Sequence, residues 1–251
     1  MRLHRSFPMR HAAIAWACAL LPLAATAQMT NRAPAPEGCG ETRNLYGPFD
    51  YRTAAPSSRY IVEIAHFTKG VETLTKGATG PFGGDIGYTL AVFPNHARAI
   101  ITLERLVERT KRDPAEGSDM TLECYFGRGM NFAPDDHVFR MLYVNYLIRK
   151  QRLDEAQRFL AYVVERATDN PLTQFNAGML YFDMKDYDKA LVQAHRAMAM
   201  GMTRVELRQQ LTAVGRWKDP EPAAPDAAAS AASATAASAA SAPASDAQVP
   251  R

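Results

Sequence analysis

A 34-residue self-similarity in the second half of the chain constrains its fold more than any other feature. The segment "APDD" at 133–136 returns as "ATDN" at 167–170, and "RLDEA" at 152–156 returns as "DYDKA" at 186–190. Both pairs have the same offset, and apolar residues between them recur at helical spacing. A period of this length with helical patterning predicts stacked helix–turn–helix units.

An earlier and looser copy precedes these two units. "FPNH" at 93–96 is similar to "APDD" 40 residues later, which is one period plus six residues. The surplus fits the turn at 111–119, where Pro114 and Gly117 stop a helix. We therefore expect a helical array over 97–218. It comprises an enlarged, degenerate unit at 97–136, units at 137–170 and 171–204, and a capping helix at 203–217.

The 171–204 unit resembles a tetratricopeptide repeat. Its first helix contains Ala177-Gly178, a small step that lets two helices approach closely, followed by Tyr181. The 137–170 unit has Val144 and Leu147 at the positions of the glycine and the tyrosine. The resemblance implies an all-α solenoid of short helical hairpins. It also implies a non-enzymatic adaptor or scaffold that binds a partner peptide or helix in a groove lined by first helices.

The resemblance also assigns partner-binding positions. Asn145 and Asn176 occupy sites where such proteins often hold a peptide backbone, since an amide both donates and accepts hydrogen bonds. The lysines of a carboxylate clamp are missing, so a C-terminal carboxylate is not the expected ligand. The alternative is that the apolar strip is core and the arginines form an ordinary solvated face. The partner-binding residues are Met141, Asn145, Arg149, Phe175, Asn176 and Met179, with Arg98, Arg105 and Arg109 as steering charges.

The two ends of the chain differ from the expected folded body. Residues 1–27 have a basic start, an apolar run and the cleavage site Ala25-Thr26-Ala27, which predicts a signal peptide cut after Ala27 and a periplasmic protein without a transmembrane span. Residues 219–251 are rich in Ala, Ser and Pro, which predicts a disordered tail. The signal carries three arginines of the net +3 charge (29 − 26), so the remainder has a net charge of zero. This balance gives no indication of a nucleic-acid partner.

Two cysteines, Cys39 and Cys124, remain after signal cleavage. In an oxidising compartment an even pair favours a disulfide. The alternative is two unpaired cysteines, with Cys124 buried.

No catalytic, metal-binding or cofactor-binding motif is present. The four remaining histidines have no metal-ligand spacing, there is no GxSxG, and the glycine-rich stretch "TGPFGGDIGYTL" at 79–90 lacks the Lys and hydroxyl of a phosphate loop. The competing hypothesis is an enzyme, or a small-molecule or glycan-binding protein. Its site would lie where residues 40–96 meet the repeats, lined by Tyr51, His66, Asp85 and Tyr88.

We expect residues 28–96 to be partly irregular and partly helical. Helices are predicted through "RYIVEIAHF", "VETLTK" and Ile86 to Val92, with the aromatics Tyr46, Phe49 and Tyr51 covering the first repeat helix. Each glycine near position 80 breaks the chain, but their number exceeds what one helix start requires. The predicted N-caps are Ser57 or Ser58, Asp85, Asp154 and Asp188.

Overall fold

The computed structural model describes residue 39 and residues 46–220. Within this part the protein is all-helical, with ten helices, no strand and 64% of the residues in helices. The signal peptide expected at 1–27 and all but the first two residues of the expected tail lie outside the described residues.

The helices follow one another with short connections, apart from longer ones between α2 and α3 and between α4 and α5. Three of them belong to the region before the repeats, and the other seven lie within the expected array. The helices are α1 (Pro56–His66), α2 (Lys69–Glu72), α3 (Phe82–Val92), α4 (Ala97–Thr110), α5 (Leu122–Phe132), α6 (His137–Arg149), α7 (Leu153–Arg166), α8 (Pro171–Asp183), α9 (Tyr187–Ala199) and α10 (Glu206–Ala213).

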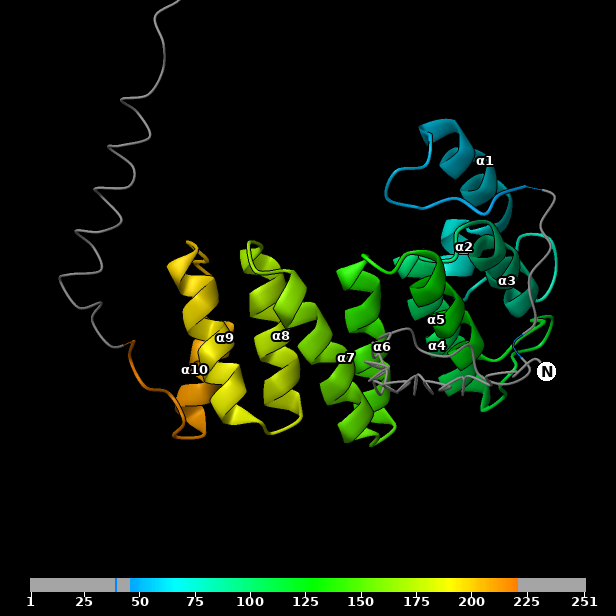
Figure 1. Ribbon diagram of the computed structural model, residues 1–251. Coiled ribbons are helices and arrows are strands. Elements are labelled where there is room, and N and C mark those ends of the chain that lie inside the picture. The colour runs from blue at the N-terminus through cyan, green and yellow to red at the C-terminus, as the bar shows by residue number, and fades with distance from the viewer. Residues whose placement is uncertain (1–38, 40–45, 221–251) are drawn as a thin grey trace, which may run out of the picture. The chain divides into compact units, whose positions relative to one another are not determined.

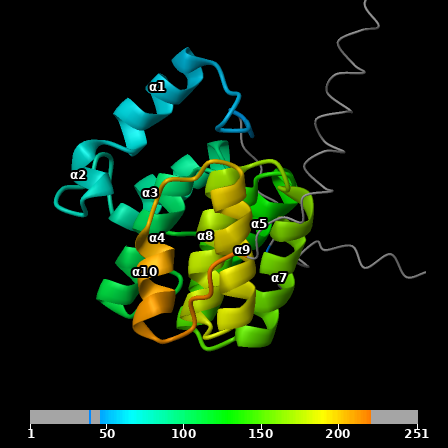
Figure 2. The same ribbon diagram turned by 90° about the vertical axis from the view of Figure 1, so that its left-hand side faces the viewer.

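The helices from α4 onward form two layers. Helices α4, α6, α8 and α10 contact one another in that order, while α7 and α9 pack as hairpin partners of α6 and α8. Figure 1 shows α6 to α10 side by side, and Figure 2 looks along this row. The core between the layers contains Leu147, Leu160 and Leu207, all essentially inaccessible to solvent. Each such side chain stabilises the fold by about 1.5–3 kcal/mol.

Short turns repeat along the array. His96, Asp136 and Asn170 each cap the next helix by accepting a hydrogen bond from the backbone N–H three residues later. The repeated segments at 93–96, 133–136 and 167–170 are therefore capping segments. The other ends of these helices are also alike, because Lys111, Gln151 and Lys185 all take a left-handed conformation where the chain turns into the second helix.

Four predicted N-caps are wrong. Helix α7 begins at Leu153 and α9 at Tyr187, so Asp154 and Asp188 lie in the first turn, and Asp186 is the residue that caps α9. Helix α1 begins at Pro56, whose fixed φ and missing N–H suit a first helical position, so neither Ser57 nor Ser58 is its cap. Asp85, the fourth predicted cap, lies inside α3.

Two predicted helices are shorter than expected. Helix α2 covers Lys69–Glu72 rather than "VETLTK", because Leu74 has a positive φ and turns the chain. The capping helix α10 covers Glu206–Ala213 rather than 203–217. After it, Trp217 packs edge-on against His195 of α9.

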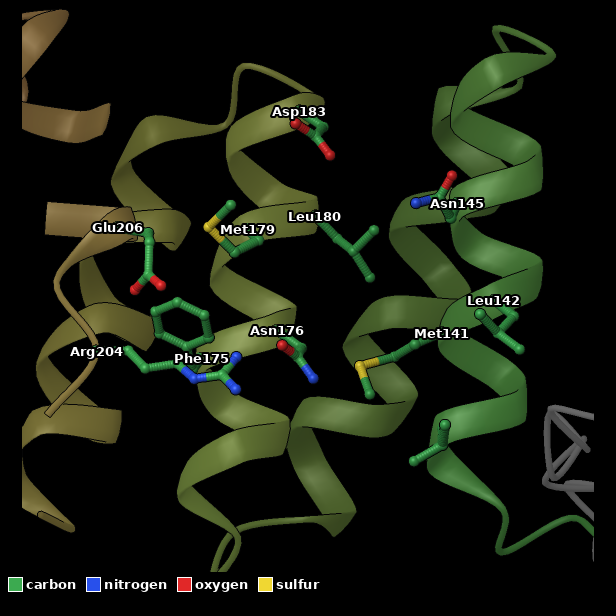
Figure 3. A pocket seen from close by; sticks show the side chains of 11 residues that line it. Met141, Leu142, Asn145, Phe175, Asn176, Met179, Leu180, Asp183, Arg204 and Glu206 are labelled. Atoms are coloured by element: carbon green, nitrogen blue, oxygen red, sulfur yellow. The ribbon is translucent and has the colours of Figure 1, made fainter. Parts of the chain in front are cut away.

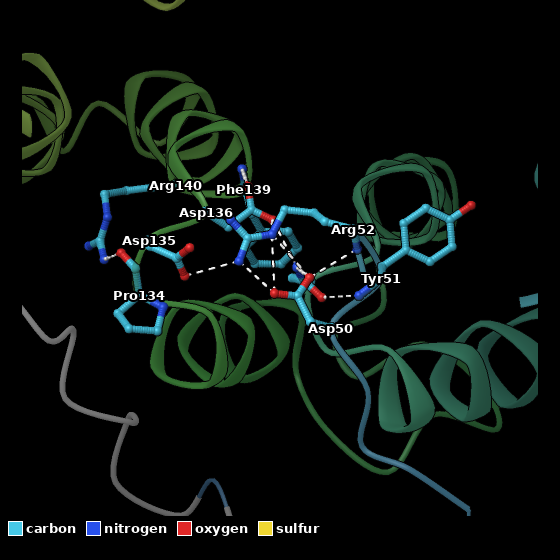
Figure 4. A network of polar contacts seen from close by, with 9 residues as sticks. Asp50, Tyr51, Arg52, Pro134, Asp135, Asp136, Phe139 and Arg140 are labelled. Atoms are coloured by element: carbon cyan, nitrogen blue, oxygen red, sulfur yellow. Dashed lines mark hydrogen bonds and ion pairs between the residues drawn. The ribbon is translucent and has the colours of Figure 1, made fainter. Parts of the chain in front are cut away.

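The segment before α1 is fastened to the loops that lead into α4 and α6. Tyr46, Phe49 and Tyr51 pack on a small core around Phe93, and the Phe49 N–H donates to the Val92 carbonyl at 2.8 Å. Figure 4 shows the polar part of this attachment. Arg52 contacts Asp50, Asp135 and Asp136, and Asn95 donates hydrogen bonds to Asp50 and Asp136. The hydrogen bond from Arg52 lowers the pKa of Asp50 to about 2.

A disulfide makes a further attachment. It joins Cys39 to Cys124 of α5, with the two Cα atoms 5.4 Å apart. The bond closes a loop of 85 residues that includes α1 to α4.

Candidate functional site

A cavity of about 500 Å³ lies between α6, α8 and the start of α10. We call it the α6–α8 groove, and Figure 3 shows its side chains. Helical periodicity places residues three and four apart on one face, which is why Met141 and Asn145 of α6 and Asn176 and Met179 of α8 all line it. The lining residues are Val138, Met141, Leu142, Asn145, Phe175, Asn176, Met179, Leu180, Asp183, Arg204 and Glu206.

The apolar side chains of the groove are partly core. Met141, Phe175 and Leu180 are at most 7% exposed, whereas Leu142 and Met179 are half-buried. Phe175, a predicted partner-binding residue, therefore forms part of the floor of the groove. Met179 lies higher on the wall, where its flexible thioether side chain can adapt to a ligand.

Five polar side chains of the groove have no partner within the described part of the chain. No hydrogen bond or ion pair to another described residue involves Asn145, Asn176, Asp183, Arg204 or Glu206. The Arg204 guanidinium instead lies over the ring of Phe175, 5.7 Å from its centroid. Polar groups that converge on a cavity without internal partners are available for a ligand.

Arg149, expected in the groove, has a different role. Its guanidinium pairs with Glu104, and its Nε lies 3.6 Å from Glu108, both on α4. Arg149 therefore connects α6 to α4 and does not line the groove.

The three expected steering arginines contact the protein's own chain. The Arg105 guanidinium donates to the Glu72 carbonyl at 3.1 Å, and that of Arg109 donates to the Leu74 carbonyl at 3.0 Å. Arg98 pairs with the Glu72 carboxylate at 3.3 Å. Residues 69–75 thus cover this face of α4, and none of the three arginines lines the α6–α8 groove. The sequence prediction placed a short helix at 71–76 but gave no sign that this segment packs on the arginine face of α4.

Asp85, expected to cap a helix, is the fourth residue of α3, which begins at Phe82. Its buried carboxylate accepts hydrogen bonds from the Ala78 N–H at 2.8 Å and from the Thr79 hydroxyl at 2.5 Å. Burial alone would raise the pKa of Asp85, but these hydrogen bonds outweigh it and hold the pKa below its ordinary value. Asp85 therefore fixes the preceding loop to α3.

The four residues of the competing hypothesis form two groups. The His66 ring stacks on Tyr88 with centroids 4.0 Å apart, and its Nδ1 lies 3.4 Å from Asp85 Oδ1. Tyr51 instead stacks on His96 and donates its hydroxyl to Glu63 at 2.6 Å. The aromatic and acidic groups of this region thus pair with one another.

Close packing explains Gly83 and Gly87. A Cβ atom on Gly83 would lie 2.3 Å from the Glu116 carbonyl oxygen, and one on Gly87 would lie 2.8 Å from the Tyr125 hydroxyl. The glycine-rich stretch is therefore the surface of α3 on which the turn at 115–118 and α5 rest.

Six lining residues are not among the predicted partner-binding residues: Val138, Leu142, Leu180, Asp183, Arg204 and Glu206. Val138, Leu142 and Asp183 share the helical register of the predicted residues on α6 and α8, so the sequence pattern already indicates them as groove positions. Arg204 was expected inside the capping helix at 203–217, but it lies in the connection between α9 and α10.

No group of three or more His, Cys, Asp or Glu side chains in the described part of the chain is placed to hold a metal ion. Among residues 46–220, no helix is long and apolar enough to cross a membrane. Comparisons with protein-family models, with curated proteins and with solved structures found no match for this chain.

Proposed function

We propose that this protein is an exported, tetratricopeptide-like adaptor or scaffold that binds a partner peptide or helix in the α6–α8 groove. The repeat assignment is supported by the hairpins α6–α7 and α8–α9, whose equivalent turn residues Gln151 and Lys185 are 34 positions apart. The export assignment is supported by the sequence of residues 1–27 and by the disulfide, which is typical of oxidising compartments.

The observation that carries the binding function is the combination of an apolar floor with five unpartnered polar side chains. Asn145 and Asn176 come from neighbouring helices of one layer and both reach the groove (Figure 3). An amide side chain offers both a donor and an acceptor to a peptide backbone. Met179 supplies apolar surface that a partner side chain would cover, above the floor formed by Phe175.

The test compares partner recovery from a cell-envelope extract. Wild-type protein, the Asn145→Ala/Asn176→Ala variant and the Asp154→Ala/Asp188→Ala variant serve as bait. The control positions are exposed, are also 34 residues apart, and lie on α7 and α9 rather than on α6 and α8.

We expect the asparagine variant to recover at least tenfold less of any partner, because two hydrogen bonds worth about 1 kcal/mol each are lost. The control should match wild type. Circular dichroism checks that all three are folded. Equal recovery by the asparagine variant and the control would show that partners bind elsewhere.

A further inference from the structure

The charges of the α6–α8 groove are unevenly distributed. Asp183 and Glu206 lie on either side of Met179, whereas Arg204 lies lower, beside Phe175 (Figure 3). The lining contains one arginine and two carboxylates, which gives a net charge of −1. The part of the groove around Met179 therefore presents negative charge without a cation between the two carboxylates.

Three carboxylates elsewhere in the helical array are paired with arginines. Glu104 contacts Arg149, and the Arg152 guanidinium lies 2.6 Å from both Glu123 and Glu155. Asp183 has no such partner, and desolvation by its surroundings raises its pKa. A cation that entered the groove would offset this cost of desolvation.

The neighbouring face of α4 indicates how the array holds a chain segment. There, Val71 is fully buried, while Arg105 and Arg109 donate to the carbonyls of Glu72 and Leu74. That face of α4 therefore holds the segment by donating hydrogen bonds to its backbone carbonyls and by burying one apolar side chain. Around Met179 the charged groups are acceptors instead, so a ligand has to bring the donors.

We propose that the groove selects a peptide in which a Lys or Arg lies next to a large apolar residue. The cationic side chain binds between Asp183 and Glu206, and the apolar side chain contacts the half-buried Met179. This specificity rests on the proposed peptide-binding function, and the charge of the groove argues for it.

The experiment selects ligands from a displayed library of random ten-residue peptides. Three immobilised proteins are compared: wild type, Asp183→Asn/Glu206→Gln, and the control Asp154→Asn/Asp188→Asn on α7 and α9. The best wild-type peptide is then synthesised with its basic residue intact or replaced by norleucine. Its dissociation constants are measured by fluorescence anisotropy.

We expect wild type and the control to enrich peptides with a basic residue beside Leu, Met or Phe. The Asp183→Asn/Glu206→Gln variant should keep the apolar preference and lose the basic one. Norleucine should weaken binding to wild type about fivefold, as for an ion pair of about 1 kcal/mol. It should have no effect on the variant.

Three outcomes would overturn the proposal. Wild type could enrich apolar peptides with no basic residue, or norleucine could weaken binding equally to wild type and to the variant. In both cases the peptide-binding function stands if Asn145→Ala/Asn176→Ala weakens binding. If wild type enriches no peptide at all, the proposed function fails together with this inference.

Discussion

Gly83 shows how one residue position can be fixed by a segment far along the chain. A Cβ atom there would lie 2.3 Å from the Glu116 carbonyl oxygen and 3.1 Å from the Ser118 nitrogen, both backbone atoms that a rotamer change cannot move. At Gly80, three residues earlier, no atom lies within 4 Å of the same position, and its φ is not positive. Gly83 therefore leaves no room for a side chain, whereas Gly80 does.

The first prediction compares Gly83→Ala with Gly80→Ala. Gly83→Ala should lower the free energy of unfolding by about 1–3 kcal/mol, because the turn at 115–118 has to move away from α3. Gly80→Ala should change it by less than about 0.5 kcal/mol. Urea unfolding followed by circular dichroism measures both. Equal stability of the two variants would show that α3 and the turn do not pack this closely in solution.

The difference between these two glycines could not be predicted from the sequence. The pattern at 79–90 identifies a chain break, and the absence of Lys and hydroxyl groups rules out a phosphate loop. The reason for Gly83 and Gly87, however, is the approach of Glu116 and Tyr125. Contacts of this kind appear only once α3 and α5 are placed side by side.

At the scale of elements, periodicity predicted the existence of helices better than their starts. The degenerate unit expected at 97–136, with its turn at 111–119, is observed as α4 and α5. The predicted caps Asp154 and Asp188 are two residues too late, because the turns after α6 and α8 are completed by the left-handed residues Gln151 and Lys185. An aspartate in a first turn and an aspartate at an N-cap look alike in a single sequence.

His96 caps α4 in a way that makes the helix sensitive to pH. Its Nδ1 accepts from the Ala99 N–H at 3.1 Å, so the neutral ring donates from Nε2 to Glu63 at 3.3 Å. Burial lowers the pKa of His96 to about 4, against the attraction of Glu63, and Arg98 lowers it further. Protonation would put a second donor where the cap needs an acceptor.

The second prediction follows from this lowered pKa. The folded state resists protonation that the unfolded chain accepts, so stability is full above about pH 6.5 and is lost as pH falls toward 4. Between pH 6.5 and 5 the loss from His96 should be about 1.5 kcal/mol.

His96→Asn provides the control for this prediction. Asparagine keeps a capping oxygen but does not titrate. Its free energy of unfolding should therefore fall less than that of wild type over the same pH range, because the two proteins differ only at this position. Parallel pH profiles from urea unfolding would contradict the role of His96.

For the molecule as a whole, predictions within one repeat were more successful than predictions between distant segments. Asn145, Asn176 and Met179 were placed by their helical register, and the structure brings all three to one groove. The arginines Arg98, Arg105 and Arg109 have the same register on α4, yet residues 69–75 occupy their face. Register shows which way a side chain points, but it does not show whether another segment already covers it.

The third prediction concerns the disulfide, which links the start of the described chain to α5. Removing the bond in Cys39→Ala/Cys124→Ala should lower the free energy of unfolding by about 4 to 5 kcal/mol, the chain-entropy value for a loop of 85 residues. Urea unfolding of the variant and wild type, under non-reducing conditions, measures this difference.

The segment before α1 should nevertheless stay in place in that variant. The Phe49 N–H still donates to the Val92 carbonyl, the Tyr51 N–H donates to Asn95 at 2.9 Å, and Arg52 still contacts Asp50 and Asp135. In the variant, the amides of Phe49 and Tyr51 should therefore still be protected from hydrogen exchange. Their exchange should be limited only by the lower free energy of unfolding of the whole protein. Complete loss of protection at these two amides in an otherwise folded variant would show that the disulfide, and not the contacts around Arg52, holds this segment against the helices.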